Sequence, residues 1–307
     1  MGSAEGFDSI TLTSADGRTT AEFVPEANLV CCSLMVDGTE VLERRRGVRA
    51  YAEQGKTMGI PFLYPWANRL ARFGYQAAGK EVTLSQEDAR IPRDDNGLPI
   101  HGVVPGLLRW DVEDGGGPDS LSAVLEWRSP ELLELFPFVH EVRVGATVGN
   151  GDLRLTTTVT AAADGPVPVS FGYHPYARVP AGSRDDWVVT LGATDRIVLD
   201  DHSIPTGERA AIDREPFRLE GTSLDDAFDA PPDPAFVAAT NDAELMVTFL
   251  AGYSYAQVFA PAGQEFICFE PMTAATNALN SGDGLSVLAP GESYRAAFRI
   301  AASRGVG

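Results

Sequence analysis

Apolar and polar residues alternate along much of the chain with the period of two that is typical of a β-strand. Leu153, Leu155 and Val159, for example, can all face one buried side while the polar residues between them face the other. The pairs Asp16-Gly17 and Asp37-Gly38 separate such runs, which predicts hairpin turns. The strands expected from this pattern cover residues 10–13, 20–23, 28–36, 40–42, 81–84, 123–127, 140–148, 153–161, 187–191, 197–199, 244–249, 256–259, 265–269 and 294–300.

The expected strands indicate one large all-β domain. Glycine and proline, at 31 and 21 residues, are spread evenly, with no concentration that would mark a linker. Only one short helix is expected, with Ser129 as its N-cap and Pro130 in its first turn. A chain of 307 residues is near the upper limit for one hydrophobic core. We therefore expect residues 1–307 to form a single, large, mostly antiparallel β-sandwich.

Charge and composition narrow the classes of function. The formal net charge of −19 repels phosphate groups, so no nucleic-acid partner is expected. The one basic run, Arg44–Arg46 with Arg49, has glutamates around it and is interpreted as a solvated loop. No stretch approaches the roughly 20 apolar residues of a membrane span, and no secretory signal is visible, so we expect a cytoplasmic protein without a membrane partner. Cys31, Cys32 and Cys268 are too few for a disulfide framework and are expected to be small buried side chains.

The four histidines occupy two kinds of position. His174 follows a strand-like run that stops at a proline, and His101 ends a turn-rich segment. Strand ends and loops are where a rigid sheet presents chemical groups, so both are candidate site residues. His140 lies within a charged strand and is interpreted as a surface residue, whereas His202, beside two aspartates, is interpreted as a loop residue.

Three further polar residues stand in apolar surroundings. Glu270 ends an almost wholly apolar strand, where a carboxylate is costly unless it is paired or functional. Asn68 and Arg69 interrupt an aromatic and apolar stretch. Taken singly, each residue also has a structural interpretation, such as an ion pair for Arg69 or a paired carboxylate for Glu270.

Together, the segments that contain these residues form an ordered series of motifs. The series consists of 66–69, 79–84, 96–102 with Trp110, 166–176, 224–228 and 269–277. In composition, order and spacing it resembles the aldose 1-epimerase (galactose mutarotase) family, from about residue 28 to the C-terminus. The resemblance implies the family fold, a large antiparallel β-sandwich called a supersandwich, with the site in a cleft on one face.

The resemblance also implies roles for individual residues. Glu270 corresponds to the general base and His174 to the general acid of the family. The residues implied to bind the sugar are Asn68, Arg69, His101 and Asp225. The neighbouring Asp226 is an alternative to Asp225 in that role. The implied function is aldose 1-epimerase (mutarotase) activity, the interconversion of the α and β anomers of an aldose.

This chemistry needs only an acid and a base. One group removes the proton of the anomeric hydroxyl while another protonates the ring oxygen, and the roles exchange on ring closure. With ordinary pKa values near 4.3 and 6.5, a Glu–His pair is suited to this without large shifts. No nucleotide- or metal-binding motif is present in the sequence, and neither a cofactor nor a metal is expected.

Alternatives remain open at this point. A mutarotase of a hexose phosphate or acidic sugar is one, since Arg72, Arg90 and Arg93 are available to bind an anion. A carbohydrate-binding sandwich without turnover is another, and a glycosidase that uses Glu270 and Asp225 is a third. The expected partner in the preferred interpretation is a small sugar, and the protein is expected to be a monomer or a homodimer.

Overall fold

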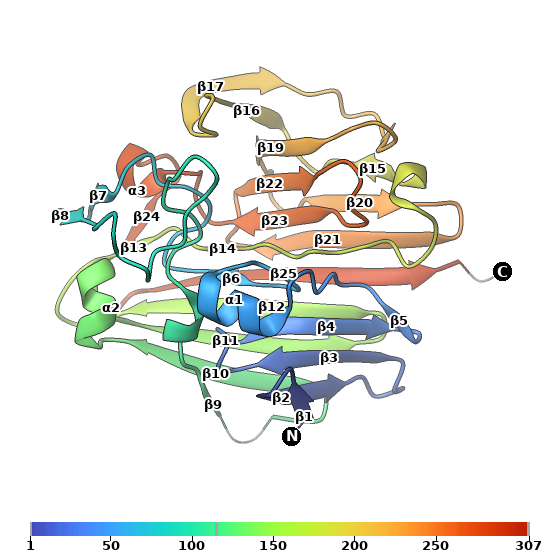
Figure 1. Cartoon of the computed structure of the whole chain (residues 1–307), viewed down its shortest axis with the longest axis horizontal. Coiled ribbons are helices and arrows are strands. Elements are labelled where there is room, and N and C mark those ends of the chain that lie inside the picture. Colours follow the sequence, from blue (N-terminus) through green and yellow to red (C-terminus); the bar gives the residue numbers. More distant parts are fainter. Residues whose placement is uncertain (1, 114–115, 306–307) are drawn as a thin grey trace.

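Strands make up nearly all of the regular structure in the computed structural model, which describes residues 2–113 and 116–305 (Figure 1). In this part of the chain, neighbouring strands of each sheet run antiparallel. The predicted all-β, antiparallel fold class is therefore confirmed.

The largest sheet has nine strands. Their spatial order is β18 (Phe217–Arg218), β15 (Val188–Thr190), β20 (Ala235–Ala239), β21 (Ala243–Ala251), β25 (Ser293–Arg304), β12 (Asp152–Ala161), β11 (His140–Gly149), β10 (Ser120–Trp127) and β9 (Asp111–Val112). In Figure 1 the long C-terminal strand β25 crosses the middle of the molecule, between β12 and β21. Strands from the middle and the end of the chain thus share one sheet.

Two further sheets complete the sandwich. The seven-stranded sheet has the order β17 (Pro205–Ala211), β16 (Asp195–Leu199), β19 (Leu224–Asp229), β22 (Tyr255–Ala260), β23 (Cys268–Met272), β14 (Gly172–Tyr173) and β6 (Phe62–Leu63). The five-stranded sheet consists of β1 (Gly2–Ala4), β2 (Phe7–Thr13), β3 (Thr19–Val24), β4 (Val30–Val36) and β5 (Thr39–Glu40). Small two-stranded sheets pair β7 (Gly74–Ala77) with β8 (Lys80–Thr83) and β13 (Val167–Val169) with β24 (Ser286–Leu288).

The core lies between the nine-stranded sheet and the other two. Phe269 of β23 packs against Phe236 of β20 with ring centroids 5.6 Å apart. Tyr173 of β14 lies 5.0 Å from Phe298 of β25 in the same way. Strands β2 and β3 of the five-stranded sheet contact β11. Burial of these aromatic side chains is the main favourable term for such a sandwich.

Helices are few and short. They are α1 (Gly47–Gln54), α2 (Pro130–Leu135) and α3 (Ala278–Ser281), with 3₁₀ turns at η1 (Pro105–Leu107) and η2 (Arg184–Asp186). The predicted start of α2 is confirmed, because the Ser129 side chain accepts a hydrogen bond from the backbone N–H of Leu132 and Pro130 follows it. Helix α1 was not expected, and Arg49 lies in it, so the interpretation of the whole basic run as a loop is wrong. Within the described residues, no helix has both the length and the apolar character needed to cross a lipid bilayer.

The expectation that His140 is a surface residue is also wrong. Its side chain is only 1% exposed, and its ring stacks on Trp127 with centroids 5.5 Å apart. Its Nδ1 donates a hydrogen bond to the carbonyl oxygen of Phe138 at 2.6 Å, and its Nε2 is hydrogen-bonded to the hydroxyl of Tyr64. The physical reason is strand parity, since His140 shares the inward face of β11 with Val142. His202 is exposed in a turn, as predicted.

Candidate functional site

Three adjacent strands of the seven-stranded sheet carry the acidic part of the site. Glu270 of β23 is paired with Gln257 of β22, which is paired in turn with Ala227 of β19. Asp225 precedes Ala227 by two residues, so strand alternation places all three polar side chains on one face. Phe269 points into the core, so this face is turned away from the nine-stranded sheet. Glu270 lies inside β23 and does not end a strand, contrary to the sequence-based expectation.

A loop next to this face brings in Asn68 and His101. Both residues have left-handed backbones, with φ of 55° and 60°, and the N–H of His101 donates to the carbonyl oxygen of Asn68 at 2.9 Å. The following residue has to be glycine, because a Cβ on Gly102 would lie 1.9 Å from the carbonyl oxygen of Tyr64. Left-handed non-glycine residues are costly and concentrate at functional sites.

The position of Arg69 is fixed by several polar contacts. Its Nε donates to Asp94 at 2.7 Å and its Nη1 donates to the side-chain oxygen of Asn68 at 3.0 Å. Its carbonyl oxygen accepts from the backbone N–H of Asn277 at 3.0 Å, and the side chain of Asn277 accepts from the N–H of Ala71 at 3.0 Å. Arg69 thus forms an ion pair with Asp94 and also lines the cavity. Its interpretation as part of a structural ion pair is therefore compatible with its interpretation as a binding residue.

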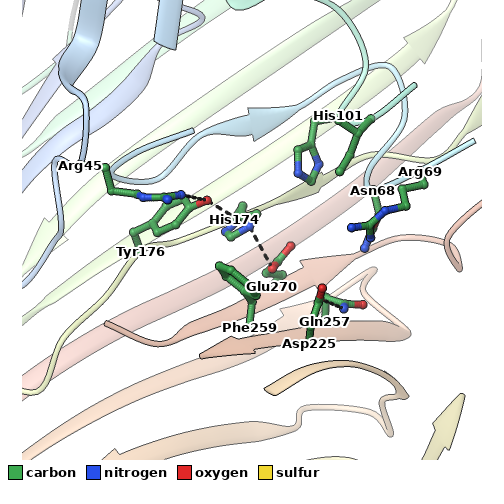
Figure 2. Close-up of a pocket in the computed structure, with 11 residues that line it drawn as sticks. Arg45, Asn68, Arg69, His101, His174, Tyr176, Asp225, Gln257, Phe259 and Glu270 are labelled. Atoms are coloured by element: carbon green, nitrogen blue, oxygen red, sulfur yellow. Dashed lines mark hydrogen bonds and ion pairs between the residues drawn. The ribbon is translucent and has the colours of Figure 1, made fainter. Parts of the chain in front are cut away.

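His174 follows β14 and contacts the carboxylate of Glu270. Its Nε2 lies 3.2 Å from Oε1 of Glu270 and 3.3 Å from the hydroxyl of Tyr176, on which the imidazole ring stacks at 4.4 Å (Figure 2). The ring of His101 lies 5.5 Å from that of His174, centroid to centroid. The stacking and the contact with Glu270 hold the imidazole in one orientation.

Burial shifts the pKa of all three titratable groups at the centre of the site. It raises the pKa of Glu270, and the nearby charge of Asp225 adds to this effect. It lowers the pKa of His174, with smaller contributions from His101 and Arg45, and it lowers the pKa of His101 to about 3. The expectation that the pair works without large shifts is therefore wrong, because both side chains are almost completely enclosed.

The six residues predicted from the sequence line one cavity of about 160 Å³. They are Asn68, Arg69, His101, His174, Asp225 and Glu270. Several buried polar atoms of the lining have no hydrogen-bond partner in the described residues: Nδ1 of His101, Nδ1 of His174, Oε1 of Gln257 and Oε2 of Glu270. Such groups are rare in folded proteins and favour a polar ligand at this place. Among residues 2–113 and 116–305, no group of three or more His, Cys, Asp or Glu is arranged to hold a metal ion.

Some lining residues were not assigned from the sequence. Gln257 donates to Asp225 at 2.6 Å and is 2% exposed. It is a polar residue in an otherwise apolar strand, the signal that singled out Glu270, and that signal was available for Gln257 too. Tyr176 belongs to a predicted motif, but it had no assigned role. Arg45, interpreted as part of a solvated loop, also lines the cavity, which corrects that interpretation.

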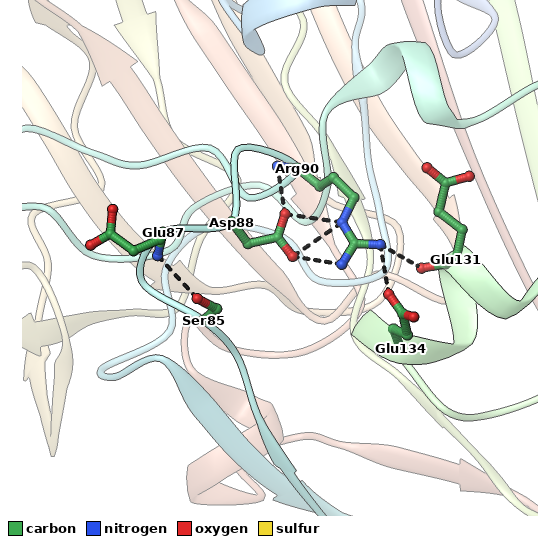
Figure 3. A network of polar contacts seen from close by, with 6 residues as sticks. All are labelled: Ser85, Glu87, Asp88, Arg90, Glu131 and Glu134. Atoms are coloured by element: carbon green, nitrogen blue, oxygen red, sulfur yellow. Dashed lines mark hydrogen bonds and ion pairs between the residues drawn. The ribbon is translucent and has the colours of Figure 1, made fainter.

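Four further candidates from the sequence lie outside the cavity lining, namely Asp226, Arg72, Arg90 and Arg93. Asp226 points elsewhere and pairs with Arg196 at 3.3 Å, which leaves the position to Asp225. Arg90 is engaged by Asp88 and Glu134, as Figure 3 shows. The remaining two are Arg72 and Arg93, of which Arg93 stacks over Phe73. None of these three arginines is therefore placed to bind an anion in the cavity.

The fold and the site define an antiparallel β-sandwich protein with a buried Glu–His pair in a polar cavity. Comparison with known proteins agrees with this class. The model of the family described as aldose 1-epimerase matches residues 29–301. The chain therefore belongs to the aldose 1-epimerase family.

Individual relatives are distant. The chain is 26% identical to the uncharacterized protein YihR of Escherichia coli K12 over 252 residues, which cover 79% of this chain and 78% of YihR. It is 27% identical to a maltose epimerase of Levilactobacillus brevis over 150 residues, or 47% of this chain and 44% of that protein. The crystal structure of a galactose mutarotase-like protein from Clostridium acetobutylicum superimposes with a TM-score of 0.82 at 18% identity, covering 94% of this chain and 93% of the other. This last likeness shows that the two share a fold.

Proposed function

We propose that the protein is a mutarotase that interconverts the α and β anomers of an aldose. The observation that carries the proposal is the contact of 3.2 Å between His174 and Glu270 on the wall of a polar cavity. The anomeric hydroxyl and the ring oxygen of a pyranose are attached to the same carbon. A base and an acid that serve them together must therefore be close neighbours, as these two side chains are.

The reaction moves two protons and breaks one bond. Glu270 takes the proton of the anomeric hydroxyl while His174 gives a proton to the ring oxygen, and the bond between the anomeric carbon and the ring oxygen breaks. Rotation about the bond between C1 and C2 of the open aldehyde presents its other face. On closure, the ring hydroxyl returns its proton to His174 and Glu270 protonates the new anomeric oxygen.

The charge balance suits a buried site. In the opening step Glu270 gains one proton and His174 loses one, so the pair keeps the same total charge. A change in net charge would be costly in surroundings of low dielectric constant. The shifts of both pKa values favour a pair that holds one proton in total, and they favour that proton on Glu270. The opening step therefore begins once this proton has passed to His174 across their contact of 3.2 Å.

The remaining lining residues are suited to hold the hydroxyls of the sugar. Arg69 and Asp225 offer a charged donor and a charged acceptor, and Gln257 offers a free carbonyl oxygen. Charge-assisted hydrogen bonds of this kind are short and directional. The similarity to a maltose epimerase supports the same reaction type.

The test is anomeric exchange measured by NMR, together with polarimetry on freshly dissolved α-anomers of glucose and galactose. We expect catalysed exchange between the α and β H1 signals of at least one aldose. Binding of an aldose without any acceleration of exchange would contradict the proposal and favour a carbohydrate-binding protein. Release of a sugar from a glycoside would favour a glycosidase instead.

A further inference from the structure

The side chain of Arg45 lies at one end of the cavity, and nothing in the proposed reaction uses it. Its Nη1 donates to the hydroxyl of Tyr176 at 3.0 Å, and its guanidinium stacks over the rings of Tyr176 and Phe266 at 4.8 and 5.4 Å. Figure 2 shows it on the opposite side of His174 from Asn68 and Arg69. The guanidinium is therefore held in place although the residue is exposed to solvent.

Arg45 and Arg46 have no acidic partner in the described residues, unlike the other two arginines of the basic run, and of these two only Arg45 lines the cavity. Arg44 pairs with Glu22 at 3.2 Å, and Arg49 pairs with Glu53 at 3.2 Å. Within the described residues, no carboxylate oxygen lies within 4.0 Å of the guanidinium of Arg45. An arginine without an acidic partner at the wall of a cavity is suited to bind an anion.

The acidic residues beside Arg45 are engaged elsewhere. Glu43 and Glu265 line a neighbouring hollow together with Arg45. The carboxylate of Glu43 pairs with Arg178 at 3.1 Å, and that of Glu265 accepts the backbone N–H of Arg184 at 3.1 Å. The charge of Arg45 is therefore not compensated by either of them.

The backbone of Arg45 is strained. Its φ is +44°, in the left-handed region that is costly for a residue with a Cβ. Two other lining residues, Asn68 and His101, share this feature, with φ of +55° and +60°. Asparagine tolerates the conformation well, whereas arginine has no such preference. Strain of this kind that is retained at a cavity wall is typical of a residue with a binding role.

From these observations we propose that Arg45 binds an anionic group on C6 of the sugar, so that the substrate is a C6-acidic aldose. The inference rests on the proposed function, because it places the ring oxygen at His174. The hydroxyl of Tyr176 is hydrogen-bonded to Nε2 of His174 at 3.3 Å and to Nη1 of Arg45 at 3.0 Å. A single hydroxyl group therefore bridges His174 and Arg45, which places the guanidinium close to the imidazole.

The bonding of a pyranose indicates which substituent lies nearest to a group at the ring oxygen. The ring oxygen is bonded to C1 and C5, and C5 carries C6. With C1 at Glu270 and the ring oxygen at His174, C5 and C6 lie beyond His174, and the proposal places C6 on the side of His174 that faces Arg45 and Tyr176. The ring hydroxyls then meet Arg69 and Asp225 on the other side. A carboxylate, phosphate or sulfate at C6 is within reach of the guanidinium, which can bind it with two parallel hydrogen bonds.

The test compares sugars that differ only at C6. Anomeric exchange is measured by NMR for glucose, glucuronate, glucose 6-phosphate and glucose 6-sulfate, with the wild-type protein and the variant Arg45→Gln. We expect kcat/KM to be about 10- to 100-fold higher for at least one of the acidic sugars than for glucose, as a charge-assisted hydrogen bond provides. The acidic sugar that is preferred identifies the anion. Arg45→Gln should remove this preference, because kcat/KM for the acidic sugar should fall about 10- to 100-fold further than kcat/KM for glucose.

Two controls separate this role from a structural one. Arg49→Gln removes the same charge from a nearby arginine with an acidic partner, and it should leave the preference intact. Arg45→Lys keeps the charge and should restore part of the preference. Equal kcat/KM values for acidic and neutral sugars, or an equal loss for both in Arg45→Gln, would overturn the inference while the proposed function stands. Absence of exchange with every aldose would overturn the proposed function itself.

Discussion

Replacement of Glu270 by glutamine separates a catalytic carboxylate from a structural one, because the two roles predict opposite effects on stability. As a general base Glu270 contributes about 10²- to 10⁴-fold to the rate, and glutamine cannot accept the proton. We expect kcat/KM for anomeric exchange to fall by this factor. It corresponds to about 3–5 kcal/mol of transition-state stabilisation at roughly 1.4 kcal/mol for each factor of ten.

The surroundings of Glu270 predict that its loss does not destabilise the fold. The side chain is 2% exposed, its Oε1 contacts only His174, and its Oε2 has no partner among the described residues. A carboxylate buried in this way costs free energy, whereas a neutral amide of the same shape avoids most of that cost. We expect the free energy of unfolding to stay unchanged or to rise by about 1–2 kcal/mol, which raises Tm by about 2–4 °C per kcal/mol.

The assay combines NMR exchange with calorimetry at pH 7. Glu244→Gln is the matched control, because Glu244 is half-buried on the nine-stranded sheet and does not line the cavity. It should change neither activity nor Tm appreciably. Removing one partner of a buried structural ion pair costs about 3–5 kcal/mol. A fall of Tm on that scale in Glu270→Gln, or an activity that stays within a few-fold of wild type, would refute the reasoning.

Three further outcomes follow from the geometry. Asp94→Asn should raise KM about tenfold with a smaller effect on kcat, because Asp94 orients Arg69 at 2.7 Å, and an unchanged KM in a concentration series would contradict this. The pH profile of kcat/KM should be a broad plateau. Burial raises the pKa of Glu270 above 4.5 and lowers that of His174 below 6.5, so both the doubly protonated and the unprotonated pair are disfavoured. A narrow bell-shaped profile between pH 4.5 and pH 6.5 would count against a buried pair. Burial lowers the pKa of His140 from 6.5 to about 4, so the neutral imidazole contributes fully to stability above pH 6.5, and the free energy of unfolding falls by about 3 kcal/mol as the pH drops to 4. In urea titrations at several pH values, His140→Phe should lose this part of the dependence of the unfolding free energy on pH. The same pH dependence in the variant and the wild type would exclude this role of His140.

Strand parity made much of the fold predictable and also explains where the prediction failed. The long strands β11, β12 and β25 alternate clearly, and the sequence pattern indicated all three. Strand β17 was missed because nearly all of its side chains are exposed at the edge of a sheet, so it has no inward face to produce a pattern. His140 was misplaced because its polar character was given more weight than its parity within β11.

The candidate site was predictable where it depends on the sheet and less so where it depends on loops. Glu270 stands out because a carboxylate in an apolar strand is unusual, and the structure shows it 2% exposed. Arg45 gave no such signal, because a run of arginines among glutamates is typical of a solvated surface. Only its left-handed backbone and its contact with Tyr176 bring it to the cavity, and neither can be inferred from alternation.

In the proposed site, the residues that carry out the reaction and the residues that set the sugar preference lie on different parts of the fold. Glu270, Gln257 and Asp225 are locked together by strand pairing, so their relative positions cannot change without loss of the sheet. Arg45 and His101 stand on connecting segments whose backbone conformation is set locally. The reacting atoms therefore meet the rigid part of the site, while the far end of the sugar meets the part that can vary without disturbing the fold. Substitutions that alter sugar preference should accordingly fall in the segments around residues 45 and 101. Substitutions that abolish the reaction should fall on the sheet and at His174, which directly follows β14.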